Sequence, residues 1–339
     1  MYILNTLDRN DKKEGISIII PFLNEADGIE LFCQVLDEHS RKLNFKLELI
    51  FVDDGSEDNT GDLIREYRFL NVEDVKLLTL SKNFGSHAAI RAGVLNASYD
   101  VCTWMGSDLQ EPLEFLELSY SKILEGYDAV YVEKKSINVS KANRGFSMLY
   151  SAMMRKWAVK NYASGGISNI VFDRKIVQYL NDNIESNSSI MLQIMDAGFK
   201  NVTISLDYKE RSIGVSKWTL AKKIKLLIDS FVAFSYMPIR LVSLIGIGMF
   251  ILGIAVGVIT MINKIYNPGV PVGYSTIISI MAMGFGITNI SLGIIAEYLW
   301  RAYDASRKRP TFIISSVKTI VKNRCIVKNI EEKRNKNER

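Results

Sequence analysis

The chain has 339 residues, of which 48% are hydrophobic and 23% charged, with a mean hydropathy of +0.08. This composition excludes a disordered chain and indicates a globular enzyme with an additional apolar part suited to a membrane. The formal net charge is +5, but the basic residues gather around the apolar C-terminal third, so we expect a membrane surface and no nucleic acid as partner.

Cysteine and histidine usage limits the kinds of metal and redox site that the chain can contain. The three cysteines are far apart in the sequence, so neither a disulfide framework nor a CxxC metal or redox site is indicated. Two histidines are too few for a three-histidine zinc site. The same cysteine usage leads us to expect the working end in the cytosol. The N-terminus carries charged residues before any apolar run and does not resemble a signal peptide.

From Ile16 to about Tyr131, short apolar runs rich in β-branched residues alternate with segments of helical pattern. The expected strands are 16–21, 47–52, 75–80 and 100–105. One expected helix begins near residue 27, a second begins near residue 59, and a third spans about 87–96. This order predicts an α/β fold with a mostly parallel sheet that has helices on both faces.

Polar clusters follow four of these strands, at the carboxyl ends where such sheets bind ligands. The clusters are Asn24-Glu25, Asp53-Asp54-Gly55-Ser56, Ser81-Lys82-Asn83 and Ser107-Asp108-Leu109-Gln110. The adjacent carboxylates of Asp53 and Asp54 can accept hydrogen bonds from a base and a ribose. The alternative is a plain turn in which Ser56 or Asn59 caps the next helix.

Asp108 and Gln110 lie two positions apart after a strand. If the extended form continues, their side chains face the same way. Two oxygen ligands at this spacing, joined by waters and a diphosphate, suit Mg²⁺ or Mn²⁺ rather than zinc. A solvated loop is the alternative interpretation.

The second half of the chain contains two uncharged segments, 241–263 and 274–296, each of 23 residues. At about 1.5 Å per residue, each is roughly 34 Å long and can cross a bilayer. Basic residues flank the pair on its outer sides, which places both termini in the cytoplasm. Seven glycines in the two segments suit close helix packing in lipid. A pair of buried helices in a large soluble protein is the alternative.

Apolar and basic residues alternate at helical spacing just before the first uncharged segment. Leu220, Ile224, Leu227 and Phe231 fall on one face, and lysines such as Lys222 fall on the other. This pattern predicts an amphipathic helix at the membrane interface, with a packing helix of the soluble domain as the alternative.

Four motifs in register carry a resemblance to a known family. They are Pro21-Phe22-Leu23-Asn24-Glu25, Val52-Asp53-Asp54-Gly55-Ser56, Ser81-Lys82-Asn83-Phe84-Gly85 and Asp108-Leu109-Gln110-Glu111-Pro112. Together they resemble the family 2 glycosyltransferases of the GT-A fold. Later residues are similar to the polyprenyl-phosphate branch, which includes dolichyl-phosphate mannose synthase and the undecaprenyl-phosphate glucosyltransferases. The residues that carry this second similarity are Arg211, Gly214, Ser216, Lys217, Trp218, Phe234, Ser235, Pro238, Glu297, Tyr298, Arg301, Tyr303, Lys308, Arg309 and Pro310.

The resemblance implies an inverting transfer of a sugar from a nucleotide-sugar, with UDP favoured, to undecaprenyl or another polyprenyl phosphate. The residues implied for nucleotide binding are Pro21, Asn24, Glu25, Asp53, Asp54 and Ser107. Asp108 and Gln110 are implied as ligands of Mg²⁺ or Mn²⁺. Arg144, Ser147 and Ser216 are implied for the acceptor phosphate, and Asp108, Arg211 and Lys217 for catalysis. The resemblance also implies a homo-oligomer.

The residue patterns and the family resemblance together predict the organisation of the chain. Residues 1–215 form a cytoplasmic GT-A catalytic domain, 216–237 the interfacial helix, 238–299 two transmembrane helices, and 300–339 a basic cytoplasmic tail. The expected location is the bacterial inner membrane, with both termini in the cytoplasm.

Two departures from the family pattern leave other readings open. Gly106 and Ser168 stand where the family usually has acidic residues, which implies a different sugar or weakened activity. The alternatives are transfer to a polysaccharide or other lipid, and a catalytically weakened membrane scaffold. A retaining glycosidase that uses Asp53 and Asp54 is disfavoured, because adjacent carboxylates at one turn cannot flank a sugar from two sides.

Overall fold

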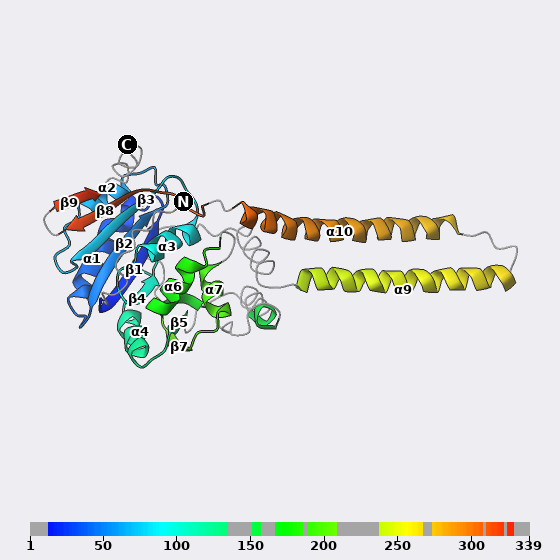
Figure 1. The fold of residues 1–339 in the computed structure, drawn as a ribbon, viewed down its shortest axis with the longest axis horizontal. Helices are drawn as coiled ribbons and strands as arrows, with labels where there is room; N and C mark the ends of the chain where they lie inside the picture. The colour runs from blue at the N-terminus through cyan, green and yellow to red at the C-terminus, as the bar shows by residue number, and fades with distance from the viewer. Residues whose placement is uncertain are drawn as a thin grey trace, which may run out of the picture. The chain divides into compact units, whose positions relative to one another are not determined.

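The computed structural model describes residues 13–134, 151–156, 167–185, 189–208, 237–266, 273–307, 310–321 and 324–328. The chain divides into two compact units: residues 1–155, 159–217 and 310–339 form the first, and residues 156–158 and 218–309 form the second. Figure 1 shows the sheet with its covering helices in the first unit and two long helices in the second.

The first unit begins with the alternation that the sequence predicts. Its first elements are β1 (Gly15–Phe22), α1 (Ala26–Ser40), β2 (Lys46–Asp53), α2 (Thr60–Glu66), β3 (Asp74–Leu80), α3 (Ser86–Leu95) and β4 (Val101–Trp104). The strands expected from continuous apolar runs are confirmed, and β1 and β2 are buried along almost their whole length. Such burial is typical of strands covered by helices on both faces.

The sheet is mixed rather than mostly parallel. The later elements are α4 (Phe115–Leu124), β5 (Ala129–Lys134), β6 (Ile167–Asp173), α6 (Arg174–Asp182), α7 (Ile190–Asp196), β7 (Asn201–Leu206), β8 (Ile314–Val321) and β9 (Arg324–Lys328). The strand order is β7-β5-β6-β4-β1-β2-β3-β8-β9. The four central strands are parallel, as is the β5/β7 pair, but β6, β8 and β9 pair only antiparallel. The prediction is therefore right for the centre and wrong for the flanks.

The segment expected to be a basic tail contributes to the sheet. Strand β8 runs antiparallel to β3, from Ile320 opposite Val75 to Ile314 opposite Leu80. Phe312 and Ile320 are 2% and 7% exposed, so this segment also adds to the core. Because β8 occupies the edge of β3, the first unit is completed by residues that follow both long helices in the sequence.

Helices cover both faces of the central sheet. Phe32 of α1, Ile64 of α2 and Phe115 of α4 belong to one hydrophobic core with β-strand residues such as Phe51. Helix α3 packs on the opposite face, where a Cβ added at Gly93 would lie 2.3 Å from the side chain of Ile19. The strand order reverses between β1 and β4, which is where sheets of this kind form a ligand crevice.

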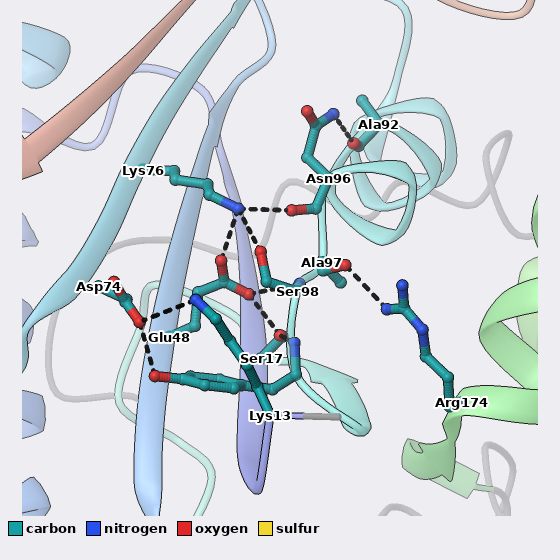
Figure 2. Close-up of polar contacts among 11 residues, drawn as sticks. Lys13, Ser17, Glu48, Asp74, Lys76, Ala92, Asn96, Ala97, Ser98 and Arg174 are labelled. Atoms are coloured by element: carbon teal, nitrogen blue, oxygen red, sulfur yellow. Dashed lines mark hydrogen bonds and ion pairs between the residues drawn. The ribbon is translucent and has the colours of Figure 1, made fainter. Parts of the chain in front are cut away.

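A buried polar network joins β1, β2 and β3 near their amino ends (Figure 2). Glu48 of β2 is 1% exposed, and its carboxylate accepts hydrogen bonds from Ser17 of β1 and from the backbone N–H of Ser98. The Lys76 ammonium of β3 lies 2.6 Å from Glu48 Oε1 and also donates to Asn96 O and Ser98 Oγ. The network therefore ties the connection between α3 and β4 to the central strands.

The second unit contains α9 (Met237–Tyr266) and α10 (Tyr274–Ser306), which contact each other and include both predicted uncharged segments. Large apolar side chains are exposed along both, among them Leu244 (71%), Ile251 (61%) and Phe285 (64%). Among the described residues, no helix is both long and apolar enough to cross a membrane. The two-span topology stays a prediction.

Two further expectations concern this part of the chain. A Cβ added at six of its seven glycines would meet no atom within 4 Å, so these six make no close contact among the described residues of this chain, and their packing in lipid stays a prediction. These glycines are Gly246, Gly248, Gly253, Gly284, Gly286 and Gly293. The amphipathic helix expected over 216–237 lies, apart from its last residue, outside the described residues.

Candidate active site

Hydrogen bonds interlock the loops that follow β1 and β2. The backbone N–H of Asn24 donates to Ser56 Oγ (3.0 Å), and the N–H of Glu57 donates to Asn24 Oδ1 (2.9 Å). The N–H of Glu25 donates to Thr60 Oγ1 at 3.0 Å. Asn24 has a φ of 52°, a left-handed conformation that asparagine tolerates better than most residues. The loops carrying the predicted nucleotide-binding residues are thus held together as one surface.

Asp53 ends β2 and is 8% exposed. Its Oδ1 accepts the backbone N–H of Ser56 at 2.8 Å. The residue also lines a cavity of about 270 Å³ together with residues of α2, β3 and β8. Ser316 and Lys318 of β8 contribute to this cavity, although the sequence pattern predicts only a basic tail at these positions.

Asp54 holds the loop that follows β3. Its Oδ1 accepts the backbone N–H of Phe84 (2.7 Å), and its Oδ2 accepts that of Gly85 (2.9 Å). Burial raises the pKa of Asp54, the two N–H donors lower it, and nearby Asp53 raises it. The carboxylate therefore has a structural partner at each oxygen. Its predicted role in nucleotide binding would use the remaining lone pairs.

The residues before and after these carboxylates lie at the same edge. Pro21 is half-buried in β1 opposite Val52, and Glu25 is half-buried directly before α1. Because β1, β2 and β3 are parallel neighbours, the structure brings the polar clusters after all three strands together, as predicted.

The loop after β4 is a tight turn. Strand β4 ends at Trp104, Leu109 has a φ of 54°, and the N–H of Gln110 donates to Asp108 Oδ1 at 3.4 Å. The expectation that an extended backbone aligns Asp108 with Gln110 is wrong, because the chain turns at Leu109. Ser107, Asp108 and Gln110 are each half-buried in this turn.

The turn offers oxygen donors of the kind that Mg²⁺ and Mn²⁺ prefer. Within the part of the chain that the structure describes, no group of three or more His, Cys, Asp and Glu side chains could hold a metal ion. A divalent cation at Asp108 and Gln110 would therefore complete its coordination with ligand oxygens or water.

Glu111, which the sequence analysis did not assign a role, completes the same turn. Its carboxylate accepts the backbone N–H of Gly106. Burial raises the pKa of Glu111 to about 8, with Asp108 adding to the rise and the Gly106 N–H and Lys134 opposing it. Its Oε2 is buried without a hydrogen-bond partner among the described residues. Glu111 stands in the fourth sequence motif, but the motif predicts no role for it, because that role depends on how the turn folds back.

Ser168, the second departure from the family pattern, belongs to a polar cluster at the ends of β5, β6 and β7. Its hydroxyl donates to Val132 O at 2.9 Å and pairs with the hydroxyl of Tyr208. Lys134 Nζ lies 4.5 Å from the centre of the Tyr208 ring. Ser168 thus connects these strands through hydrogen bonds rather than placing an acidic group there.

Five predicted site residues lie outside the described residues, and their roles stay predictions. They are Arg144, Ser147, Arg211, Ser216 and Lys217.

Comparisons with known proteins point to one family. Residues 17–187 match the family model described as glycosyl transferase family 2. A Bacillus subtilis (strain 168) protein named "Uncharacterized glycosyltransferase YkcC" is 30% identical over 300 residues, covering 88% of this chain and 92% of that protein. The undecaprenyl-phosphate 4-deoxy-4-formamido-L-arabinose transferase of Proteus mirabilis (strain HI4320) is 26% identical and covers 91% and 95%.

A more distant match is the solved structure of glucosyl-3-phosphoglycerate synthase from Mycobacterium tuberculosis in complex with UDP. It has a TM-score of 0.46 and 17% identity, and covers 65% of this chain and 78% of that one. The family model and the curated relatives establish the class: the protein is a glycosyltransferase. The chain belongs to glycosyl transferase family 2, and the predicted resemblance is confirmed.

Proposed function

We propose that this glycosyltransferase moves a sugar from a nucleotide-sugar, with UDP as the favoured nucleotide, to a polyprenyl phosphate at the cytoplasmic face of the membrane. The observation that carries the proposal is the interlocked carboxyl-end surface, which joins Asp53 and Asp54 to the loops after β1 and β3. The relatives from Proteus mirabilis and Yersinia enterocolitica are both named undecaprenyl-phosphate 4-deoxy-4-formamido-L-arabinose transferase. They align over more than nine-tenths of this chain and support the acceptor.

Electrostatics explain why this reaction needs a metal ion and basic residues rather than a strong general base. The acceptor phosphate is already an anion and needs no strong general base. The barrier lies in bringing it to a sugar whose leaving group, a diphosphate, is also anionic. Asp108 and Gln110 would hold Mg²⁺ or Mn²⁺, which when bound would neutralise charge on the leaving diphosphate. A single displacement at the anomeric carbon then inverts its configuration.

The second unit supports a membrane location. Large apolar side chains are exposed along α9 and α10, within two segments that carry no charged residue, and a surface of this kind favours lipid over water. A polyprenyl chain stays in the bilayer while a nucleotide stays in water, so the two substrates must meet at the interface. Lys217, Arg211 and Ser216 would reach the phosphates there.

The test is a product assay on the full chain in detergent. We would incubate it with a panel of UDP- and GDP-sugars and undecaprenyl phosphate, and identify lipid products by mass spectrometry. Undecaprenol, which lacks the phosphate, is the matched control acceptor. A glycosylated undecaprenyl phosphate, formed only when the phosphate is present, is the expected result. Sugar transfer only to undecaprenol or to a polysaccharide, or no transfer from any donor, would overturn the proposal.

A further inference from the structure

The carboxylate of Glu111 lies buried in the turn that presents Asp108 and Gln110. It accepts the backbone N–H of Gly106, and it is close enough to Asp108 for the two negative charges to repel. Its Oε2 has no hydrogen-bond partner among the described residues. A buried carboxylate oxygen without a partner is costly, and this cost is removed when a cation or a donor occupies the site.

Lys134 is close enough to lower the pKa of Glu111 but makes no hydrogen bond to this oxygen. Lys134 lies over the ring of Tyr208, with its Nζ 4.5 Å from the ring centre. Among the described residues, no lysine, arginine or histidine forms an ion pair with Glu111. The turn therefore holds a second carboxylate near Asp108, and none of the basic side chains that the structure describes forms an ion pair with it.

We infer that Glu111 is a second acidic ligand of the divalent cation that Asp108 and Gln110 bind, and so a further catalytic residue of the proposed transfer. Two carboxylates and one amide from a single turn are hard oxygen donors, and the diphosphate and water complete the coordination. This assignment rests on the proposed function, because the nucleotide-sugar of the proposed transfer supplies the diphosphate that the cation would bind.

The geometry at Gly106 allows a carboxylate at position 106 to replace the carboxylate of Glu111. A Cβ added at Gly106 would lie 3.2 Å from Asp108 Oδ1, so an aspartate at position 106 would bring its carboxylate beside that of Asp108. Gly106 has no positive φ that would exclude a side chain. Gly106→Asp can therefore replace the charge lost in Glu111→Gln from the other end of the same turn.

Manganese binding to the full chain in detergent tests the inference without turnover. Electron paramagnetic resonance of free Mn²⁺ gives the Kd, first with the metal alone and then with UDP. Glu111→Gln keeps an oxygen acceptor for the Gly106 N–H and removes the charge, so we expect the Kd for Mn²⁺ to rise at least about tenfold. The double variant Gly106→Asp/Glu111→Gln should recover most of this loss. Glu114→Gln, which removes an exposed acid at the start of α4, should leave the Kd unchanged.

The outcomes separate the inference from the proposed function. An unchanged Kd in Glu111→Gln, or a weakened Kd that the double variant does not recover, overturns the role of Glu111 while the proposed function stands. If the wild-type chain binds neither Mn²⁺ nor UDP, the proposed function fails together with the inference. Thermal unfolding of each variant, with Glu111→Asp as a conservative replacement, shows whether a weakened Kd reflects a misfolded turn. Loss of Mn²⁺ binding in Glu111→Gln only with a collapsed melting temperature also overturns the role.

Discussion

Asp53 and Asp54 are adjacent in the sequence, yet their carboxylates have different surroundings. Asp53 accepts the N–H of Ser56 in its own turn, whereas Asp54 accepts the N–H groups of Phe84 and Gly85 in the next loop. The pattern of two acids after a strand predicts a polar edge, but it does not predict that the two carboxylates bind different loops. A mutation at Asp54 is therefore expected to affect loop position as well as ligand binding.

Asp108 provides the residue-scale prediction. Asp108→Asn keeps the size of the side chain and removes the charge that would hold the divalent cation at the leaving diphosphate. We expect turnover with undecaprenyl phosphate to fall roughly 100-fold or more, as for the loss of a direct charge-stabilising group. Turnover is measured over a range of Mg²⁺ and Mn²⁺ concentrations.

The control for this experiment is Glu114→Gln, which removes an exposed acid near the same loop and should leave turnover unchanged. Near wild-type turnover of Asp108→Asn, with undiminished dependence on the divalent ion, would contradict the role assigned to Asp108.

At the scale of elements, the network around Glu48 holds β1, β2 and β3 in register at their amino ends. Glu48→Gln leaves the ammonium of Lys76, which is 21% exposed, without its buried counter-charge. Breaking a buried pair from one side is strongly destabilising, and we expect a loss of about 3 kcal/mol in the free energy of unfolding of the first unit. Urea denaturation followed by tryptophan fluorescence measures this change.

A matched exposed pair serves as the control. Lys46 and Glu73 are 4.0 Å apart with side chains 72% and 68% exposed, so Glu73→Gln should cost less than about 1 kcal/mol. If the two variants were equally stable, the buried network would not be what holds the strand ends together.

The docking of β8 gives a second prediction at this scale. Phe312 is 2% exposed beside the start of β8, and Phe312→Ala should destabilise the first unit by about 3 kcal/mol through a lost apolar contact and a cavity. Its neighbour Ile313 is 50% exposed, so Ile313→Ala is the matched control and should have little effect. Equal melting temperatures for the two variants would show that this segment does not complete the core.

At the scale of the whole molecule, the testable feature is the topology of the two uncharged segments. Single cysteines are placed at Asn267, between the segments, and at Ser306, after the second, with Cys33, Cys102 and Cys325 replaced by Ala. The distribution of basic residues predicts that a membrane-impermeant maleimide labels position 267 in intact cells and position 306 only after lysis. Labelling of position 306 in intact cells would contradict the predicted topology. Labelling of neither position would show that the linker between the segments is not exposed outside the cell.

The sequence by itself determined the central part of this protein. Continuous apolar runs identify strands β1 to β4, and the polar clusters after them identify the ligand edge, because both features are local in the chain and strands of this kind are buried on both faces. The four motifs that follow β1, β2, β3 and β4 are local in the same way, and together they predict the family to which the chain belongs.

Only the tertiary structure decided the flanks and the details of the site. The antiparallel pairing of β8 with β3 joins residues more than two hundred positions apart, and no local pattern reports such a partner. The hydrogen bonds from Phe84 and Gly85 to Asp54, and from Gly106 to Glu111, likewise depend on where the loops turn rather than on residue spacing. Sequence periodicity reports which residues are buried, whereas the partner of each buried polar group is set by chain segments that meet only in the folded protein.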